Sequence, residues 1–153
     1  MPARHAASAP AAQGASRLAS ATPDEVLKAS RAFDKLRNLR GHFSGARWSA
    51  EVDAWEGELH RAMQVLAAWS AQQRLQAGAL KQLMGAPDET TSCTDDSCDA
   101  TLRSLKWPGE RMPPVAKQST ELWIYHWRGG RDRLVIVMKD ARVGAAGWDY
   151  LGE

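Results

Sequence analysis

The chain of 153 residues is long enough for one domain of ordinary size and a tail, and too short for two domains with separate cores. Its residues are 44% hydrophobic and 25% charged, which matches globular proteins and excludes a fully disordered or collagen-like chain. The 20 basic and 18 acidic side chains leave a formal net charge of +2, so the whole chain has no electrostatic preference for nucleic acid or anionic membranes.

Residues 1–22 are rich in alanine and serine and contain arginine but no acidic residue. Such a segment buries too little apolar surface to fold, so we expect a disordered tail. The same composition suits a mitochondrial presequence, which stays open as the alternative to a cytoplasmic or nuclear protein. The longest apolar runs have five residues, against the ~20 required to cross a bilayer, and we expect no membrane span.

The first helix is predicted to begin after Thr22, whose hydroxyl can cap it, with Pro23 at the first helical position. Apolar side chains then recur at spacings of three and four as far as Leu36, which is typical of one buried helical face. We expect this helix over about 23–39, ended by the glycines that begin at Gly41.

A second, longer helix is predicted to begin at Ser49 and to carry one continuous apolar face over five turns. The residues of this face are Val52, Trp55, Leu59, Ala62, Met63, Leu66 and Trp69. On the opposite face we expect Glu56 and His60 to form a solvated pair, because a zinc-protease motif needs a second histidine. Residues 71–84 favour a third helix, which Gly85 would end.

Residues 86–119 hold four of the seven prolines and an acidic cluster, and we expect a long acidic loop. The acids are Asp88, Glu89, Asp95, Asp96 and Asp99, and their spacing does not fit a calcium loop. Within this loop, we favour free thiols for Cys93 and Cys98, with a disulfide between them as the second interpretation. No histidine has the spacing to complete a zinc site with them, and we expect no metal and no cofactor.

The pattern changes to period two in the last third, where residues 121–127, 133–138 and 142–148 predict three strands. Gly129 and Gly130 suit a hairpin turn between the first two. The predicted fold is therefore a single α+β domain over 23–153, with two to three N-terminal helices packed on one face of a three-stranded antiparallel β-meander.

From residue 80 to residue 150 this pattern resembles the SmpA/OmlA domain, most closely over the segments 83–87 (Leu-Met-Gly-Ala-Pro) and 122–127 (Leu-Trp-Ile-Tyr-His-Trp). That family is found in an outer-membrane assembly lipoprotein and is similar to β-lactamase inhibitory proteins. The resemblance implies two helices on an antiparallel sheet and a role in protein contacts without catalysis. The run from His42 through Trp48, Trp55 and Met63 is also similar to uncharacterised small fungal proteins, which implies a fold and no activity.

The strand over 121–127 is apolar on both sides, with Leu122, Ile124 and His126 on one side and Trp123, Tyr125 and Trp127 on the other. We expect the helices to bury the larger aromatic row. In the alternative, that row is exposed beside the arginines of the hairpin and forms a docking surface. The candidate binding residues are accordingly Trp123, Tyr125, Trp127, Arg128, Arg131 and Arg133.

These observations favour a non-catalytic protein-interaction or assembly module, with an unidentified, acidic protein partner for the hairpin arginines. No nucleophile elbow or phosphate-binding glycine motif is present, so an enzyme is the weaker class. The alternatives are a small hydrolase-like enzyme centred on His126, with Asp132 or Asp149 as its partner, and a single-stranded nucleic-acid binder. Docking of the acidic loop on the arginines within the same chain is a further possibility.

Overall fold

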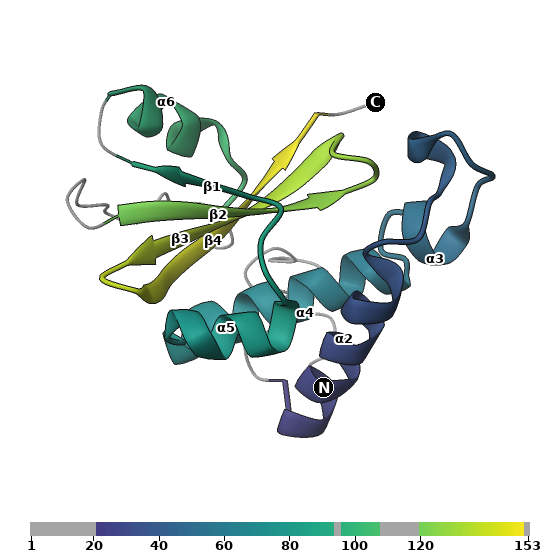
Figure 1. Ribbon diagram of the computed structural model, residues 1–153, viewed down its shortest axis with the longest axis horizontal. Helices are drawn as coiled ribbons and strands as arrows, with labels where there is room; N and C mark the ends of the chain where they lie inside the picture. Colours follow the sequence, from purple (N-terminus) through teal and green to yellow (C-terminus); the bar gives the residue numbers. More distant parts are fainter. Residues whose placement is uncertain (1–20, 94–95, 108–119, 152–153) are drawn as a thin grey trace, which may run out of the picture.

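The computed structural model describes residues 21–93, 96–107 and 120–151 as an α+β fold in three layers (Figure 1). The helices are α2 (Pro23–Leu36), α3 (Ala50–Asp53), α4 (Glu58–Gln73), α5 (Ala77–Met84) and α6 (Asp96–Ser104), with a 3-10 turn, η2 (His42–Ser44). The strands are β1 (Glu89–Ser92), β2 (Thr120–Trp127), β3 (Asp132–Lys139) and β4 (Arg142–Tyr150). Among these helices, none combines the length and apolar character needed to cross a membrane. The tail prediction falls almost entirely on residues outside the described ranges.

Helix α2 begins where the sequence predicts. The Thr22 hydroxyl accepts a hydrogen bond from the Glu25 N–H at 3.1 Å, and the Glu25 carboxylate accepts one from the Thr22 N–H at 2.7 Å. This reciprocal capping box satisfies two N–H groups that the helix itself leaves without partners. The predicted apolar face is buried up to Leu36, where the helix ends three residues earlier than expected.

The predicted single helix from Ser49 to Trp69 is wrong, because the chain leaves the helical conformation between α3 and α4. Glu56 has a φ of 63°, and the next residue is a glycine packed against the preceding turn. A Cβ atom on Gly57 would lie 2.4 Å from the Ala50 carbonyl oxygen, so only glycine fits there. The break turns Trp55 away from the buried face, and its side chain is 52% exposed.

The third predicted helix is shorter than expected. Helix α4 continues to Gln73, and Arg74 then adopts the left-handed conformation (φ 51°) that ends it. Helix α5 begins only at Ala77 and ends at Gly85, where φ is 74°.

Strands β2, β3 and β4 form the predicted antiparallel meander, and β1 adds a fourth strand at the edge beside β2. The prediction of three strands is therefore wrong by one edge strand, which lies in the segment expected to be loop. All four β1 residues are polar and exposed, so they lack the alternation of apolar and polar residues that indicates a half-buried strand.

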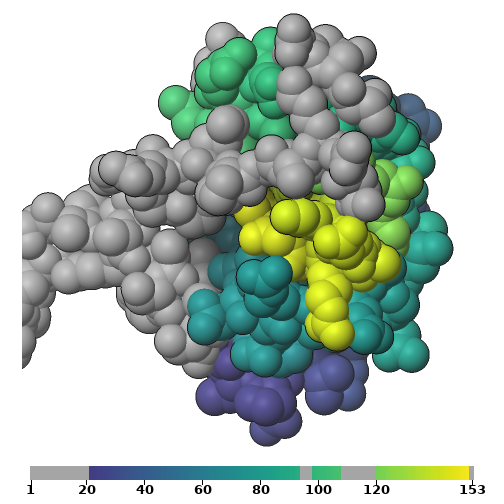
Figure 2. Space-filling view, turned by 90° about the vertical axis from the view of Figure 1, so that its left-hand side faces the viewer, coloured from purple at the N-terminus to yellow at the C-terminus, as the bar shows by residue number. Residues whose placement is uncertain are grey.

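The second face of the sheet is covered by α6, so the expectation that helices pack on one face only is wrong. Leu102 and Leu105, at the end of α6 and just beyond it, are buried against the sheet. The residues of the sheet in this second core are Leu122, Ile124, Val135 and Val137. Figure 2 shows the layers from the side, with β4 in yellow between α6 in green and the teal and purple helices. A second cover is needed because β2 and β3 are apolar on both sides.

The segment of residues 96–107 crosses the second face from one edge of the sheet to the other, and we call it the strap. It begins beside β1 and ends at β4, where Lys106 and Trp148 exchange two backbone hydrogen bonds of 2.7 and 2.9 Å. The Trp107 ring then packs on Gly147, where a Cβ atom would lie 2.9 Å from it. The strap therefore tethers both edges of the sheet.

A disulfide joins Cys93 to Cys98 at the start of the strap, so the expected free thiols are wrong and the second interpretation is confirmed. Both cysteines are buried in the apolar core under α6. The sequence does not show how the two cysteines pack. In the structure, their burial under α6 places their Cα atoms 5.2 Å apart, a distance that a disulfide spans.

We predict that removing this disulfide lowers the free energy of unfolding by about 2 kcal/mol, because a closed loop of six residues restricts the unfolded chain only moderately. The variant is Cys93→Ala with Cys98→Ala, and the measurement is urea denaturation followed by circular dichroism. A reducing agent should shift the wild-type midpoint to that of the variant and leave the variant unchanged. A reductant effect of equal size on both proteins would contradict the prediction.

Candidate functional site

The aromatic row of β2 is buried, as expected, beneath α2, α4 and α5. Trp123, Tyr125 and Trp127 all belong to the core on this face of the sheet. The alternative of an exposed aromatic ladder is therefore wrong, and these three candidate binding residues lie in the interior. The remaining candidates are the hairpin arginines.

Each buried ring of this row also satisfies its polar atom. The Trp127 indole N–H donates to the Val52 carbonyl at 2.7 Å, and the Tyr125 hydroxyl donates to the Gly85 carbonyl at 2.9 Å. Burial raises the pKa of the Tyr125 hydroxyl well above its ordinary value. These bonds fix α3 and the end of α5 on the sheet, which gives the row a structural role.

The three hairpin arginines have different surroundings. Arg128 lies over the rings of Trp127 and Phe43, at 4.4 and 4.8 Å from their centroids, and donates to buried Asp132 at 2.6 Å. Arg131 lies over the same Phe43 ring at 5.4 Å. Arg133 is on the opposite face of β3 and donates to Asp149 at 2.7 Å. Of the predicted binding residues, Arg128 and Arg131 therefore share the Phe43 ring, and buried Trp127 lies against Arg128.

Their ring partner Phe43 belongs to η2, in a segment held in place by one buried carboxylate. Asp53 accepts hydrogen bonds from the N–H groups of His42 and Ser49, both at 2.8 Å. Gly41 packs directly on this carboxylate, where a Cβ atom would approach to 2.3 Å. These contacts fix the segment between α2 and α3 on α3, and the hairpin packs on it at Gly129, where a Cβ atom would lie 2.8 Å from the Phe43 carbonyl oxygen.

This segment supplies surface residues that the functional prediction did not include. Trp48 and Trp55 are 58% and 52% exposed, the largest exposed rings of the described residues. The signal was present in the sequence, because the run from His42 to Trp55 carries three large aromatic residues among mostly small and polar residues. The sequence places only Trp55 of these rings, on the apolar face of the second predicted helix.

A series of contacts makes these side chains one surface. Trp48 contacts Phe43 with ring centroids 6.5 Å apart, and Phe43 lies under both Arg128 and Arg131. Beyond Arg128, the buried Trp127 ring contacts Trp55, and Trp55 contacts Tyr150 at 4.7 Å. The aromatic–arginine surface is formed by Phe43, Trp48, Trp55, Arg131 and Tyr150, and the Arg128 side chain, only 8% exposed, lies beneath it.

Beneath this surface lies His60, which is fully buried. Its ring stacks on Trp127 at 4.1 Å, its Nδ1 accepts a hydrogen bond from the Glu56 N–H, and its Nε2 lies 3.0 Å from the Tyr150 hydroxyl. The expected solvated pair with the Glu56 carboxylate is therefore wrong. Burial, with a smaller effect of Arg128, lowers the pKa of His60 to about 4, so the ring is neutral at pH 7 and its Nε2–H donates to Tyr150.

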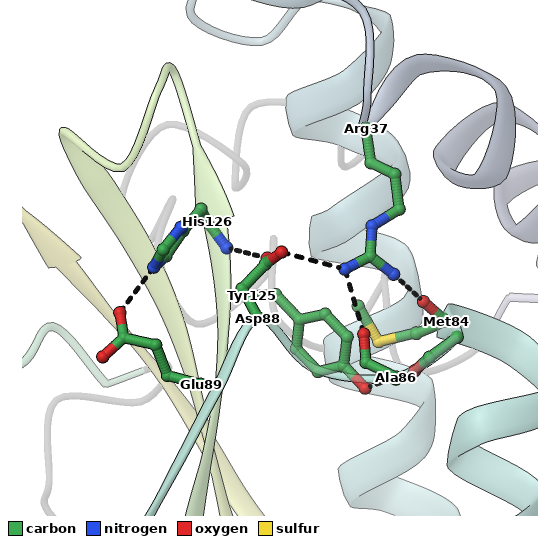
Figure 3. A network of polar contacts seen from close by, with 8 residues as sticks. Arg37, Met84, Ala86, Asp88, Glu89, Tyr125 and His126 are labelled. Carbon is green, nitrogen blue, oxygen red and sulfur yellow. Dashed lines mark hydrogen bonds and ion pairs between the residues drawn. The ribbon is translucent and has the colours of Figure 1, made fainter.

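His126 lies in a separate polar network on the β1 side of the sheet (Figure 3). Its Nε2 is 2.5 Å from a Glu89 carboxylate oxygen, and its backbone N–H donates to Asp88 at 2.8 Å. Asp88 also pairs with Arg37 of the segment after α2, at 3.4 Å. His126 is therefore held on its strand by two acidic side chains.

The partners proposed for a catalytic His126 are engaged elsewhere. Asp132 is paired with Arg128, and Asp149 with Arg133. The acids that follow α5 contact Arg37 and His126, so among the described residues this part of the acidic segment does not dock on the hairpin arginines. Nor do the described residues bring three histidine, cysteine, aspartate or glutamate side chains together as metal ligands.

No protein-family model, curated protein or solved structure matches this chain. The site is therefore interpreted from its own geometry.

We predict that His60 makes the protein less stable as the pH falls from about 6.5 to about 4. In this range the unfolded chain binds a proton at the histidine and the folded chain does not, so the free energy of unfolding decreases by up to about 3 kcal/mol. The measurement is urea denaturation at several pH values, for the wild type and for His60→Gln. The difference between the two proteins should shrink as the pH falls, and a constant difference would contradict the prediction.

Proposed function

We propose that this protein is a non-catalytic interaction module that binds an acidic protein partner through its aromatic–arginine surface. The observation that carries the proposal is the continuous series of contacts from Trp48 to Tyr150, which places exposed indoles near Arg131 and over buried Arg128 at one end of the sheet. Tryptophan, tyrosine and arginine are the residues that most often dominate the binding energy of protein interfaces.

The rigidity of this surface supports the proposal. Arg128 is held between two rings and an aspartate, and the Phe43 segment is closed on buried Asp53. Side chains that are already ordered lose little conformational entropy when a partner binds. The resemblance to the SmpA/OmlA domain, whose members act through protein contacts, agrees with this proposal.

The local charge favours an acidic partner. Residues 40–48 and 128–133 together contain five arginines and a single aspartate, and that aspartate is buried against Arg128. Carboxylates of a partner would meet complementary charge here, which speeds association and selects against basic proteins.

Two features make nucleic acid and catalysis the weaker alternatives. Arg128 and Arg133 are already paired with carboxylates, which leaves fewer arginines to contact the phosphates of a nucleic-acid strand. His126 is paired with Glu89 at a partly exposed position, and neither aspartate proposed as its catalytic partner contacts it among the described interactions.

The disulfide provides evidence on the compartment in which the protein would bind its partner. Disulfides persist mainly in oxidising compartments and are rare in the cytoplasm and nucleus. The buried Cys93–Cys98 bond therefore favours an oxidising compartment over the cytoplasmic or nuclear location that the sequence suggested.

The proposal predicts that Trp48→Ala weakens partner binding by about 30-fold, the effect of losing an interface residue worth about 2 kcal/mol. The full chain is first used to capture partners from a nuclease-treated extract of its source. The captured protein is then purified and titrated by calorimetry against the wild type and the variant. Binding should also weaken as the salt concentration rises.

The matched control is Leu27→Ala, which removes a side chain of similar exposure (47%) from α2, away from this surface. It should leave the dissociation constant unchanged. Equal affinity of the wild type and Trp48→Ala would contradict the proposal. Stoichiometric binding of a fluorescein-labelled oligouridine that Trp48→Ala abolishes would instead assign the surface to nucleic acid.

A further inference from the structure

The outer edge of β1 is an exposed row of backbone hydrogen-bonding groups. The Cys93 N–H donates to the Thr120 carbonyl. Because backbone groups alternate in direction along a strand, Cys93, Thr91 and Glu89 direct theirs toward β2. Thr90 and Ser92 therefore direct their N–H and C=O groups away from the sheet. All four side chains of β1 are exposed, and no backbone–backbone hydrogen bond among the described residues uses these outward groups.

The opposite edge of the sheet is closed by the chain itself. At one end of β4, Lys106 of the strap pairs with Trp148. At the other end, Val143 donates to the Leu75 carbonyl, and Ala77 donates to the Ala141 carbonyl. Natural proteins commonly cover or interrupt such edges to prevent unwanted pairing. Edge β1 lacks the proline or lysine that often does this, and threonine and serine there favour strand pairing.

We propose that β1 pairs antiparallel with β1 of a second copy of this chain, forming a two-fold symmetric dimer with one continuous sheet. This inference is independent of the aromatic–arginine surface, which lies at the hairpin end of β2 and β3.

The geometry selects one register for this pairing. Among registers that pair only the four residues of β1 with each other, both outward residues are used only when Thr90 faces Ser92 of the second copy, which makes four hydrogen bonds across the two-fold axis. A shift toward the N-terminus would require Asp88, whose N–H already donates to the Ile124 carbonyl. In the selected register, Thr91 faces Thr91 of the second copy on the axis.

The side chains of β1 are self-complementary in this register. A symmetric dimer requires each residue to tolerate its counterpart in the second copy. Threonine then faces threonine or serine, which are favourable cross-strand pairs, and no like charges face each other within the four residues. The only charged residue of β1, Glu89, is paired with His126 of its own chain. This self-complementarity is the reason for choosing a second copy as the occupant.

Cysteine scanning tests the register directly. Thr91→Cys places two thiols opposite each other, with Cα atoms about 4.5 Å apart, and should yield a disulfide-linked dimer on mild oxidation. Ser92→Cys alone should stay monomeric, because its two Cα atoms would be about 9 Å apart. A mixture of Thr90→Cys with Ser92→Cys should yield the mixed dimer. Non-reducing electrophoresis and mass spectrometry identify the products and confirm the native Cys93–Cys98 bond.

Sedimentation equilibrium tests the pairing without a cross-link. The wild type and Thr91→Val should associate reversibly, and Thr91→Glu should weaken association at least about tenfold because it places like charges opposite each other on the axis. Circular dichroism verifies that each variant is folded. A wild type that stays monomeric up to about 1 mM would overturn the proposal. Equal cross-linking at residues 91 and 92 would overturn it too, because random collisions give no positional preference.

Discussion

The hairpin end of the molecule depends on how one indole, that of Trp127, is buried. Its ring stacks on His60 of α4, its N–H is satisfied by the Val52 carbonyl of α3, and Arg128 lies over its outer side. One side chain of β2 thereby fixes two helices and the start of the hairpin. Because a large aromatic ring must also satisfy its N–H when buried, this position allows only one arrangement of α3 on the sheet.

Local signals in the sequence were sufficient for several elements. The start of α2 could be predicted because its capping box lies within four consecutive residues, Thr22 to Glu25. The meander could be predicted because alternating residues and Gly129–Gly130 identify strands and a turn without distant contacts. The burial of Trp123, Tyr125 and Trp127 followed from the size of their rings.

Other elements depend on contacts between distant residues and could not be predicted in this way. The apolar period runs straight through the break between α3 and α4, and only the packing of Gly57 on the preceding turn shows why the helix stops. Strand β1 exists because β2 offers it a partner, and its own residues, Glu-Thr-Thr-Ser, carry no apolar pattern. The burial of His60 likewise depends on Trp127 and Tyr150, which are remote in the sequence.

The strap covers one end of the β4 edge, and this cover limits how many further strands can be added to the sheet. A protein with two open edges can add copies without end, as in a fibril, whereas a protein with one open edge completes its assembly in a single step. Lys106 at one end of β4, and Leu75 and Ala77 at the other, therefore occupy backbone groups to which a further strand could otherwise pair. Growth of the sheet at this edge would require displacing both the strap and the turn between α4 and α5, which holds the other end of β4.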